Sequence, residues 1–170
     1  TATASDLVVC VEKMILDPRS RLVTYMHAVP NRWLIVGGSG AGICYRWFRD
    51  AFGHMEKELA QLLRKDPYEL MDQEAEKVPE GSENLVFLPY LPGVRSPLWD
   101  KNARGVYFGI GLNHDKRHFI RAVMEGVAFS IRHRLEILKK ELKVEVKEMR
   151  IVGGGAKSRI WQQIMADIYE

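Results

Sequence analysis

Cysteine is scarce in this sequence, which has only Cys10 and Cys44 in 170 residues. Neither belongs to a Cys-x-x-Cys pair, and two thiols are too few for the disulfide framework of a small secreted domain. We therefore expect both cysteines to be buried thiols in a reducing compartment. This expectation favours a cytoplasmic protein.

Long apolar runs are also lacking. No stretch approaches the ~18 consecutive apolar residues that a membrane-spanning helix needs. The first residues, TATASDLVVCVEK, have no basic flank and no cleavage site, so they do not resemble a signal peptide. Because the chain opens in an expected strand and stops in an expected helix, we expect a fragment of a longer protein. We expect no membrane partner.

An excess of one charge is absent as well. The formal net charge is +3 and the pI is about 8.9, a balance that neither requires nor excludes an anionic partner. The basic residues of the expected long helix face several directions and are not interleaved with aromatic residues. A solvated helix surface explains them, and we expect no nucleic-acid partner.

The residues that are present indicate one α/β domain. Hydrophobic residues make up 46% of the chain and charged residues 28%, which is ordinary for a globular protein. Residues 6–13, 21–29 and 32–37 are rich in β-branched and aromatic residues and are separated by turn residues. Short links between consecutive strands predict an antiparallel three-strand meander.

The remainder of the chain alternates helical and strand-like segments. A glycine-rich turn at 37–42 precedes residues with helical periodicity, and Asp66 and Pro67 are typical of the start of a second helix. This order predicts α/β crossover units that join the meander in one mixed sheet with flanking helices. The expected elements are helices at 43–65, 67–77 and 115–142, strands at 85–91 and 148–152, and a last helix that starts near Ser158.

The triple glycine at 153–155 lies between an expected strand and an expected helix. Glycines there allow positive φ angles and let a ligand approach the main chain at a helix start. The segment GGGAKS is not a P-loop, because Ala156 precedes Lys157, and it is not GxGxxG, because Ser158 takes the last glycine's place. From the residues alone, a nucleotide contact and a purely structural tight turn both remain open.

Two further patterns have plain structural alternatives. Residues 104–126 place Gly105 and Gly109 around an aromatic pair before a helix, which is also what a loop entering a core helix requires. His114 and His118 would share a helix face, but the sequence offers no third ligand, so we expect no metal site. The hydroxyl residues of TATAS could donate to a phosphate or simply form a turn.

Together these segments resemble the C-terminal domain of the FGGY carbohydrate kinases, which include the xylulokinases and glycerol kinases. The resemblance covers nearly the whole chain, and its most specific part is the second signature of the family. FLPYLPGVRSPLWDKNARG and GGGAKSRIWQQIMADI resemble the xylulokinase-type approach to that signature and the adenosine-binding turn. The residues that match the signature are Gly105, Tyr107, Gly109, Ile110, His118, Phe119, Ala122, Val123, Met124 and Glu125.

The resemblance implies a ribonuclease-H-like domain of the actin and hexokinase type, with ATP and Mg2+ as cofactors. It implies that Thr3 lies beside the β- and γ-phosphates, that Gly109 and Asn113 flank the phosphates and ribose, and that residues 154–159 receive the nucleoside. Ala2 replaces a glycine that is usual before that threonine. The implied nucleoside contacts are Gly154, Gly155, Ala156 and Arg159, the last in place of a frequent asparagine.

The implied activity is transfer of the γ-phosphate of MgATP to a hydroxyl of a sugar or polyol. No residue of this chain resembles the general base, so we expect the catalytic Asp and the sugar site to lie on an N-terminal domain. We therefore expect the isolated chain to be inactive. That domain is the expected partner, and a homodimer is compatible with the sequence. An actin-like or regulatory nucleotide-binding module without sugar kinase activity is the alternative.

Overall fold

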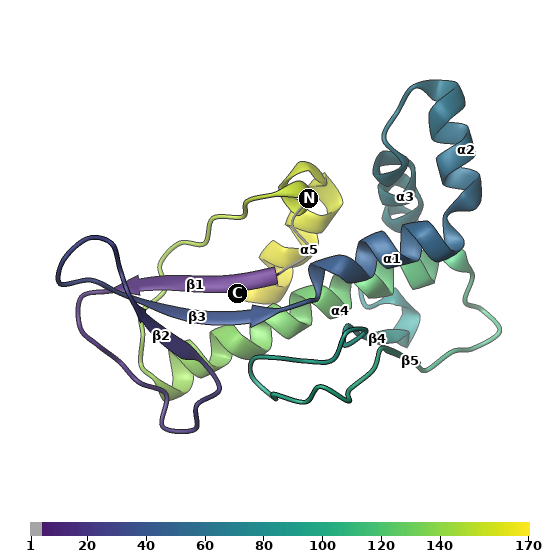
Figure 1. Cartoon of the computed structure of the whole chain (residues 1–170). Coiled ribbons are helices and arrows are strands. Elements are labelled where there is room, and N and C mark those ends of the chain that lie inside the picture. Colours follow the sequence, from purple (N-terminus) through teal and green to yellow (C-terminus); the bar gives the residue numbers. More distant parts are fainter. Residues whose placement is uncertain (1–4) are drawn as a thin grey trace.

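The computed structural model describes residues 5–170, and its first sheet has three antiparallel strands (Figure 1). The strands are β1 (Ser5–Val11), β2 (Val23–Met26) and β3 (Trp33–Ser39), and their order is β1-β3-β2. The antiparallel pairing was predicted correctly, but the meander was wrong, because β3 lies in the middle of the sheet.

The connections explain this strand order. Residues 12–22 form a wide loop in which the Asp17 carboxylate accepts hydrogen bonds from the main-chain N–H groups of Arg19, Arg21 and Leu22. The tight turn lies instead between β2 and β3, where Asn31 takes a φ of 59° and His27 N–H donates to the carbonyl of Arg32. The short link therefore pairs β2 with β3 and leaves the other edge of β3 to β1.

The helices before residue 80 meet at a sharp break. We expected one helix over 43–65, but the segment forms α1 (Gly42–Phe52) and α2 (His54–Leu63). The break is at Gly53, where an added Cβ would lie 2.6 Å from the carbonyl oxygen of Arg49. Helix α3 (Pro67–Glu76) begins as predicted, with the Asp66 carboxylate accepting a hydrogen bond from Tyr68 N–H at 3.0 Å.

A second, separate sheet follows α3 and a 3-10 turn, η1 (Ser82–Asn84). The strand expected at 85–91 is only β4 (Val86–Leu88), and it pairs antiparallel with β5 (Val106–Phe108), which we expected to be a loop. The predicted crossover units and single mixed sheet are therefore wrong for residues 5–170, whose strands form two antiparallel sheets.

Helix α4 (Lys116–Glu136), extended by the π-helical turn η2 (Ile137–Glu141), runs along the length of the molecule (Figure 1). Its C-terminal part packs against the three-stranded sheet through Leu135 and Leu138, which meet Leu7 and Ile35. Its N-terminal part packs against α1, α3, β4 and α5. This second cluster includes Phe48, Met71, Phe87, Val123 and Trp161. The helix predicted at 115–142 thus connects both parts of the core.

The strand expected at 148–152 does not form. Its residues have no regular secondary structure and make no ladder with any strand of the described chain, and Val152 is 87% exposed. Within residues 5–170 the segment does not join the outer edge of β1 or of β2, the two free edges of the first sheet. It leads into the 3-10 turn η3 (Gly154–Lys157) and then α5 (Arg159–Tyr169), which begins after Ser158 as predicted.

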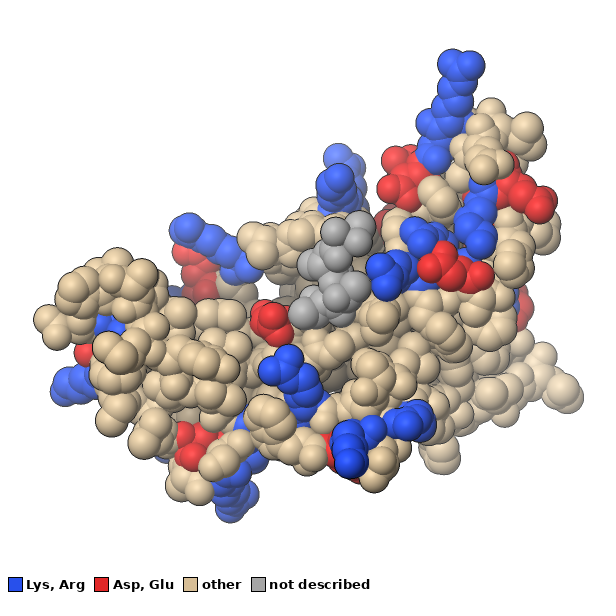
Figure 2. Space-filling model, in the orientation of Figure 1, with Lys and Arg blue, Asp and Glu red and all other residues tan. Residues whose placement is uncertain are grey.

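Two surface properties bear on function. Figure 2 shows basic and acidic side chains interspersed over one face, without a continuous basic stripe. Among the helices of residues 5–170, none has the length and apolar character needed to cross a membrane. Cys44 is buried as expected, but Cys10 is exposed, so the expectation for Cys10 was wrong. Side chains alternate between the two faces of a strand, and in β1 the side chain of Leu7 faces the core whereas Cys10 lies on the opposite face.

Candidate functional site

The turn at 153–159 is held by its own main chain. Gly153 has a φ of +91°, a conformation that side chains disfavour, and it reverses the chain after the extended segment. Ala156 N–H then donates to the Gly153 carbonyl at 3.2 Å, and Ser158 N–H donates to the Gly155 carbonyl at 3.3 Å. The Gln162 side chain donates to the Ala156 carbonyl at 2.5 Å. These contacts fix the backbone that precedes α5.

The surface of this turn is open at Gly154. A Cβ added there would meet no atom within 4 Å, whereas one added at Gly155 would lie 3.5 Å from the Trp161 ring. Gly154 has a φ outside the left-handed region, so its backbone conformation does not require glycine. What sets Gly154 apart from Gly155 is the open space around it. A bare main chain at a helix start is a surface that a flat or anionic ligand can approach closely.

Trp161 anchors the turn to the rest of the core. Its indole N–H donates to the Met124 carbonyl on α4 at 3.1 Å, and its ring centroid lies 5.1 Å from that of Tyr45 on α1. Its main-chain N–H donates to the Ser158 hydroxyl, which caps α5. The open backbone at Gly154 is therefore carried by a rigid, buried support.

Gly109 and Asn113 lie against a different turn, the one at 81–84. Gly109 has a φ of +87°, and a Cβ added there would lie 2.6 Å from the carbonyl oxygen of Asn84. The Asn113 side-chain amide donates to the Glu83 carboxylate at 2.5 Å. Both residues therefore hold this turn in place, a structural contribution that the sequence did not indicate.

The acidic end of the same pattern meets the same turn. Glu125 accepts hydrogen bonds from Gly81 N–H at 3.0 Å and from the Ser82 hydroxyl at 2.8 Å. It also forms an ion pair with Arg121, with 2.7 Å between Nε and Oε1, and both side chains are buried. Residues 105–125 thus assemble around the turn at 81–84.

The structure does not bring the two groups of predicted residues together. Gly154, Gly155, Ala156 and Arg159 belong to the turn that packs beside Met124, whereas the segment that holds Gly109 and Asn113 precedes the N-terminal end of α4 (Figure 1). Arg159 is exposed. Thr3 lies outside the described residues.

Residues 7–170 match the family model described as the C-terminal domain of the FGGY family of carbohydrate kinases. The chain belongs to this family. As an FGGY domain, it is 37% identical over 162 residues to a gluconokinase of Bacillus subtilis, and 34% identical over 166 residues to a xylulose kinase of Lactococcus lactis. These alignments cover 94% and 97% of this chain, but only 31% of each relative.

Solved FGGY structures share the fold. The gluconate kinase of Lactobacillus acidophilus matches 98% of this chain with a TM-score of 0.81 at 32% identity. The xylulose kinase of Rhodospirillum rubrum matches 99% with a TM-score of 0.80 at 30% identity. The chain covers 32% of each, so it spans about a third of the proteins that it matches. The predicted actin and hexokinase type of domain is confirmed by these matches.

In this FGGY domain, sequence reasoning missed a buried network beneath the glycine turn. Tyr45 on α1 donates from its hydroxyl to the Asp72 carboxylate on α3 at 2.7 Å, and Ser158 also donates to Asp72. Burial raises the pKa of Asp72 above its usual value, and burial likewise raises the pKa of Tyr45. No spacing in the sequence indicates this network, because its members come from α1, α3 and the N-cap of α5.

The two histidines have structural partners. His114 Nδ1 accepts a hydrogen bond from Gly111 N–H at 2.9 Å, and His118 Nδ1 accepts one from Asp115 N–H at 3.1 Å in the capping box of α4. In the part of the chain that the structure describes, no three His, Cys, Asp or Glu side chains are grouped as metal ligands.

Proposed function

We propose that this chain is the nucleotide-binding part of an ATP-dependent sugar kinase. The reaction transfers the γ-phosphate of MgATP to a hydroxyl of a sugar or polyol. The observation that carries the proposal is the open main chain at Gly154, on a buried support, in a chain of the FGGY family. An actin-like module without sugar kinase activity is disfavoured, because the family that the chain matches consists of carbohydrate kinases.

The turn at 154–156 receives the nucleoside in this proposal. Gly154 and Gly155 let the base or ribose lie against the main chain, and Ala156 adds only a methyl group to that surface. Arg159 has an exposed guanidinium that can stack on the base, because its planar charge favours aromatic faces. A contact between Thr3 and the phosphates stays a prediction. A nucleotide contact by Gly109 or Asn113 stays a prediction, and their contacts at residues 83–84 support a structural role.

Mg2+ enters this proposal with the nucleotide phosphates. ATP supplies the phosphoryl group, Mg2+ would neutralise part of its negative charge, and the residues of this chain bind and orient the nucleotide. We assign the catalytic Asp and the sugar site to an N-terminal domain outside residues 1–170. The isolated chain then binds ATP weakly and does not turn over, because the reacting hydroxyl is held by the other domain.

The acceptor is gluconate or D-xylulose in this proposal. Two relatives support these acceptors, a gluconokinase at 37% identity and a xylulose kinase at 34%. A cytoplasmic location fits a metabolic kinase of this kind. A homodimer stays a prediction.

The test is a coupled kinase assay of the intact protein that carries this chain, with gluconate and with D-xylulose. The Gly154→Leu variant places a side chain in the open space above the turn and should raise the KM for ATP at least about tenfold, because it competes with the nucleoside. Val152→Leu is the matched control, since Val152 is 87% exposed and lies just before the turn. No phosphorylation of either acceptor, or equal KM values for the two variants, would overturn the proposal.

A further inference from the structure

A pocket of about 380 Å³ lies in the angle between α1, α2 and α3. It shares no residue with the glycine turn at 153–159 and is independent of the proposed nucleotide site. Its volume falls within the roughly 300–1,000 Å³ that is typical of small-molecule sites. The residues that line it are Arg49, Lys57, Ala60, Gln61, Arg64, Lys65 and Pro67.

The backbone fixes the shape of this pocket. The break at Gly53 turns α2 away from the axis of α1, and the close approach to the Arg49 carbonyl leaves no room for a side chain at that position. At the other end of α2, Arg64 takes a left-handed φ of 53°, and Lys65 N–H donates to the Ala60 carbonyl at 2.9 Å. Two turns of fixed geometry therefore set the angle between the three helices that border this open pocket.

The lining is cationic. Four of its residues carry a positive charge and none carries a carboxylate. Among the described residues, Lys57, Arg64 and Lys65 form no ion pair within 4.0 Å, and Arg49 pairs only with its neighbour Asp50. The nearby Asp66 carboxylate is engaged in capping α3. Four cations around one concavity repel one another unless an anion enters.

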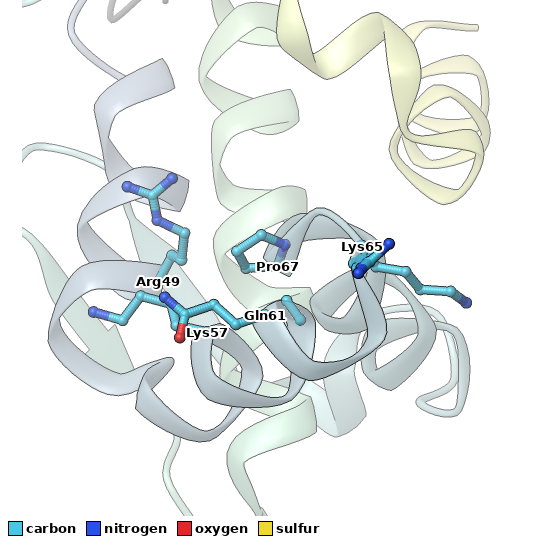
Figure 3. Close-up of a pocket in the computed structure, with 7 residues that line it drawn as sticks. Arg49, Lys57, Gln61, Lys65 and Pro67 are labelled. Carbon is cyan, nitrogen blue, oxygen red and sulfur yellow. The ribbon is translucent and has the colours of Figure 1, made fainter.

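The positions of the side chains suit a phosphoryl group. Arg49 lies 4.9 Å over the Tyr68 ring, which fixes its guanidinium, and Figure 3 shows Arg49, Lys57 and Gln61 together at one end. Lys65 extends from the opposite end of the pocket (Figure 3). Ala60, which is buried, and Pro67 supply an apolar wall between them. A planar guanidinium and an ammonium group are the usual partners of phosphate oxygens, and the wall suits a small organic portion.

We propose that this pocket binds a small organic phosphate, a site distinct from the nucleotide-binding turn. The test measures binding of phenyl phosphate and of inorganic pyrophosphate to the 170-residue chain by calorimetry at about 0.1 M ionic strength, where surface charges are partly screened. Phenyl phosphate probes the phosphoryl group together with the apolar wall, and pyrophosphate probes the charge alone. The proposal requires binding of phenyl phosphate.

Charge-matched variants locate the site. Lys57→Glu should weaken phenyl phosphate binding at least about tenfold, because it reverses the charge of a residue that lines the pocket. Lys147→Glu changes the net charge equally at an exposed position and should alter binding by less than about twofold, since screening weakens distant charges. Circular dichroism should be measured to check that both variants are folded.

Three outcomes would overturn the proposal. They are the absence of phenyl phosphate binding to the unaltered chain, equal weakening by Lys57→Glu and Lys147→Glu, and binding of pyrophosphate alone. Gly154→Leu separates this site from the nucleotide site: it should leave phenyl phosphate binding unchanged even where it weakens ATP binding. Loss of phenyl phosphate binding in Gly154→Leu, with retention in Lys57→Glu, would place the anion at the turn instead.

Discussion

The carboxylate of Glu125 accepts a hydrogen bond from the hydroxyl of Ser82 at 2.8 Å, although the two residues are 43 positions apart. The same carboxylate accepts a hydrogen bond from Gly81 N–H and forms an ion pair with the Arg121 guanidinium. The acidic residue of the FGGY signature is therefore the centre of a buried structural network in this chain. These contacts indicate that Glu125 stabilises the domain and does not take part in a reaction.

Glu125→Ala should lower the free energy of unfolding by about 3–5 kcal/mol, because it leaves the buried Arg121 charge without its partner. Urea unfolding followed by circular dichroism measures the change. Glu148→Ala is the control, since it removes an exposed carboxylate whose pair with Arg150 contributes about 0–1 kcal/mol. A cost for Glu125→Ala no larger than that of the control would contradict the structural role.

Gly109→Ala should destabilise the domain by at least about 1–2 kcal/mol, because the residue has positive φ and its Cβ would collide with the Asn84 carbonyl. Gly154→Ala should change the free energy of unfolding by less than about 0.5 kcal/mol, since its Cβ meets open space. Thermal unfolding of the two variants compares them directly. Similar melting temperatures would show that the turn at 81–84 does not need glycine at position 109.

Asp17 should make stability depend on pH in the acid range. Its hydrogen bond from Arg21, the largest cause, lowers the pKa of Asp17 from 3.8 to about 2. Because the folded-state pKa is the lower one, the stabilisation is present above the unfolded value and is lost as pH falls toward the folded value. Asp17→Asn should be less stable than the unaltered chain at pH 7.

The difference between Asp17→Asn and the unaltered chain should shrink between about pH 4 and pH 2, where the native carboxylate becomes protonated. Chemical unfolding at several pH values measures it. Glu148→Gln provides the comparison at an exposed carboxylate. If the difference in the free energy of unfolding between Asp17→Asn and the unaltered chain stays constant from pH 7 to pH 2, the Asp17 charge does not stabilise the fold.

The two cysteines should react at very different rates. Cys10 is exposed, whereas burial raises the pKa of the Cys44 thiol to about 12. A thiol reagent at pH 7 should therefore modify Cys10 quickly and Cys44 only after unfolding, since the thiolate is the nucleophile. Cys10→Ser should abolish the fast phase and Cys44→Ser should leave it. A fast phase that survives in Cys10→Ser would show that Cys44 is accessible.

Local chemistry made several elements predictable. Asp66 and Pro67 specify the start of α3, and Ser158 specifies the start of α5, because capping depends on neighbouring residues. The family could be recognised because the residues of its signature keep their spacing along the chain. The glycine turn could be recognised for the same reason.

Long-range pairing was not predictable in this way. The order β1-β3-β2 depends on which loop forms the tight turn, and Val106–Phe108 become a strand only because Val86–Leu88 lie beside them. Cys10 was expected to be buried because the sequence has no disulfide framework or Cys-x-x-Cys pair, but the register of β1 against β3 decides which side chains face the core.

The sequence by itself determined the family, the helix starts and the bare turn before α5, since each depends on residues close together in the chain. Only the tertiary structure decided that Gly109, Asn113 and Glu125 meet the turn at 81–84 rather than the glycines at 153–155. It also decided that four basic residues of α1, α2 and the link after α2 line one pocket. The physical reason is that such contacts join segments far apart in the chain, and their geometry is set by packing on α4.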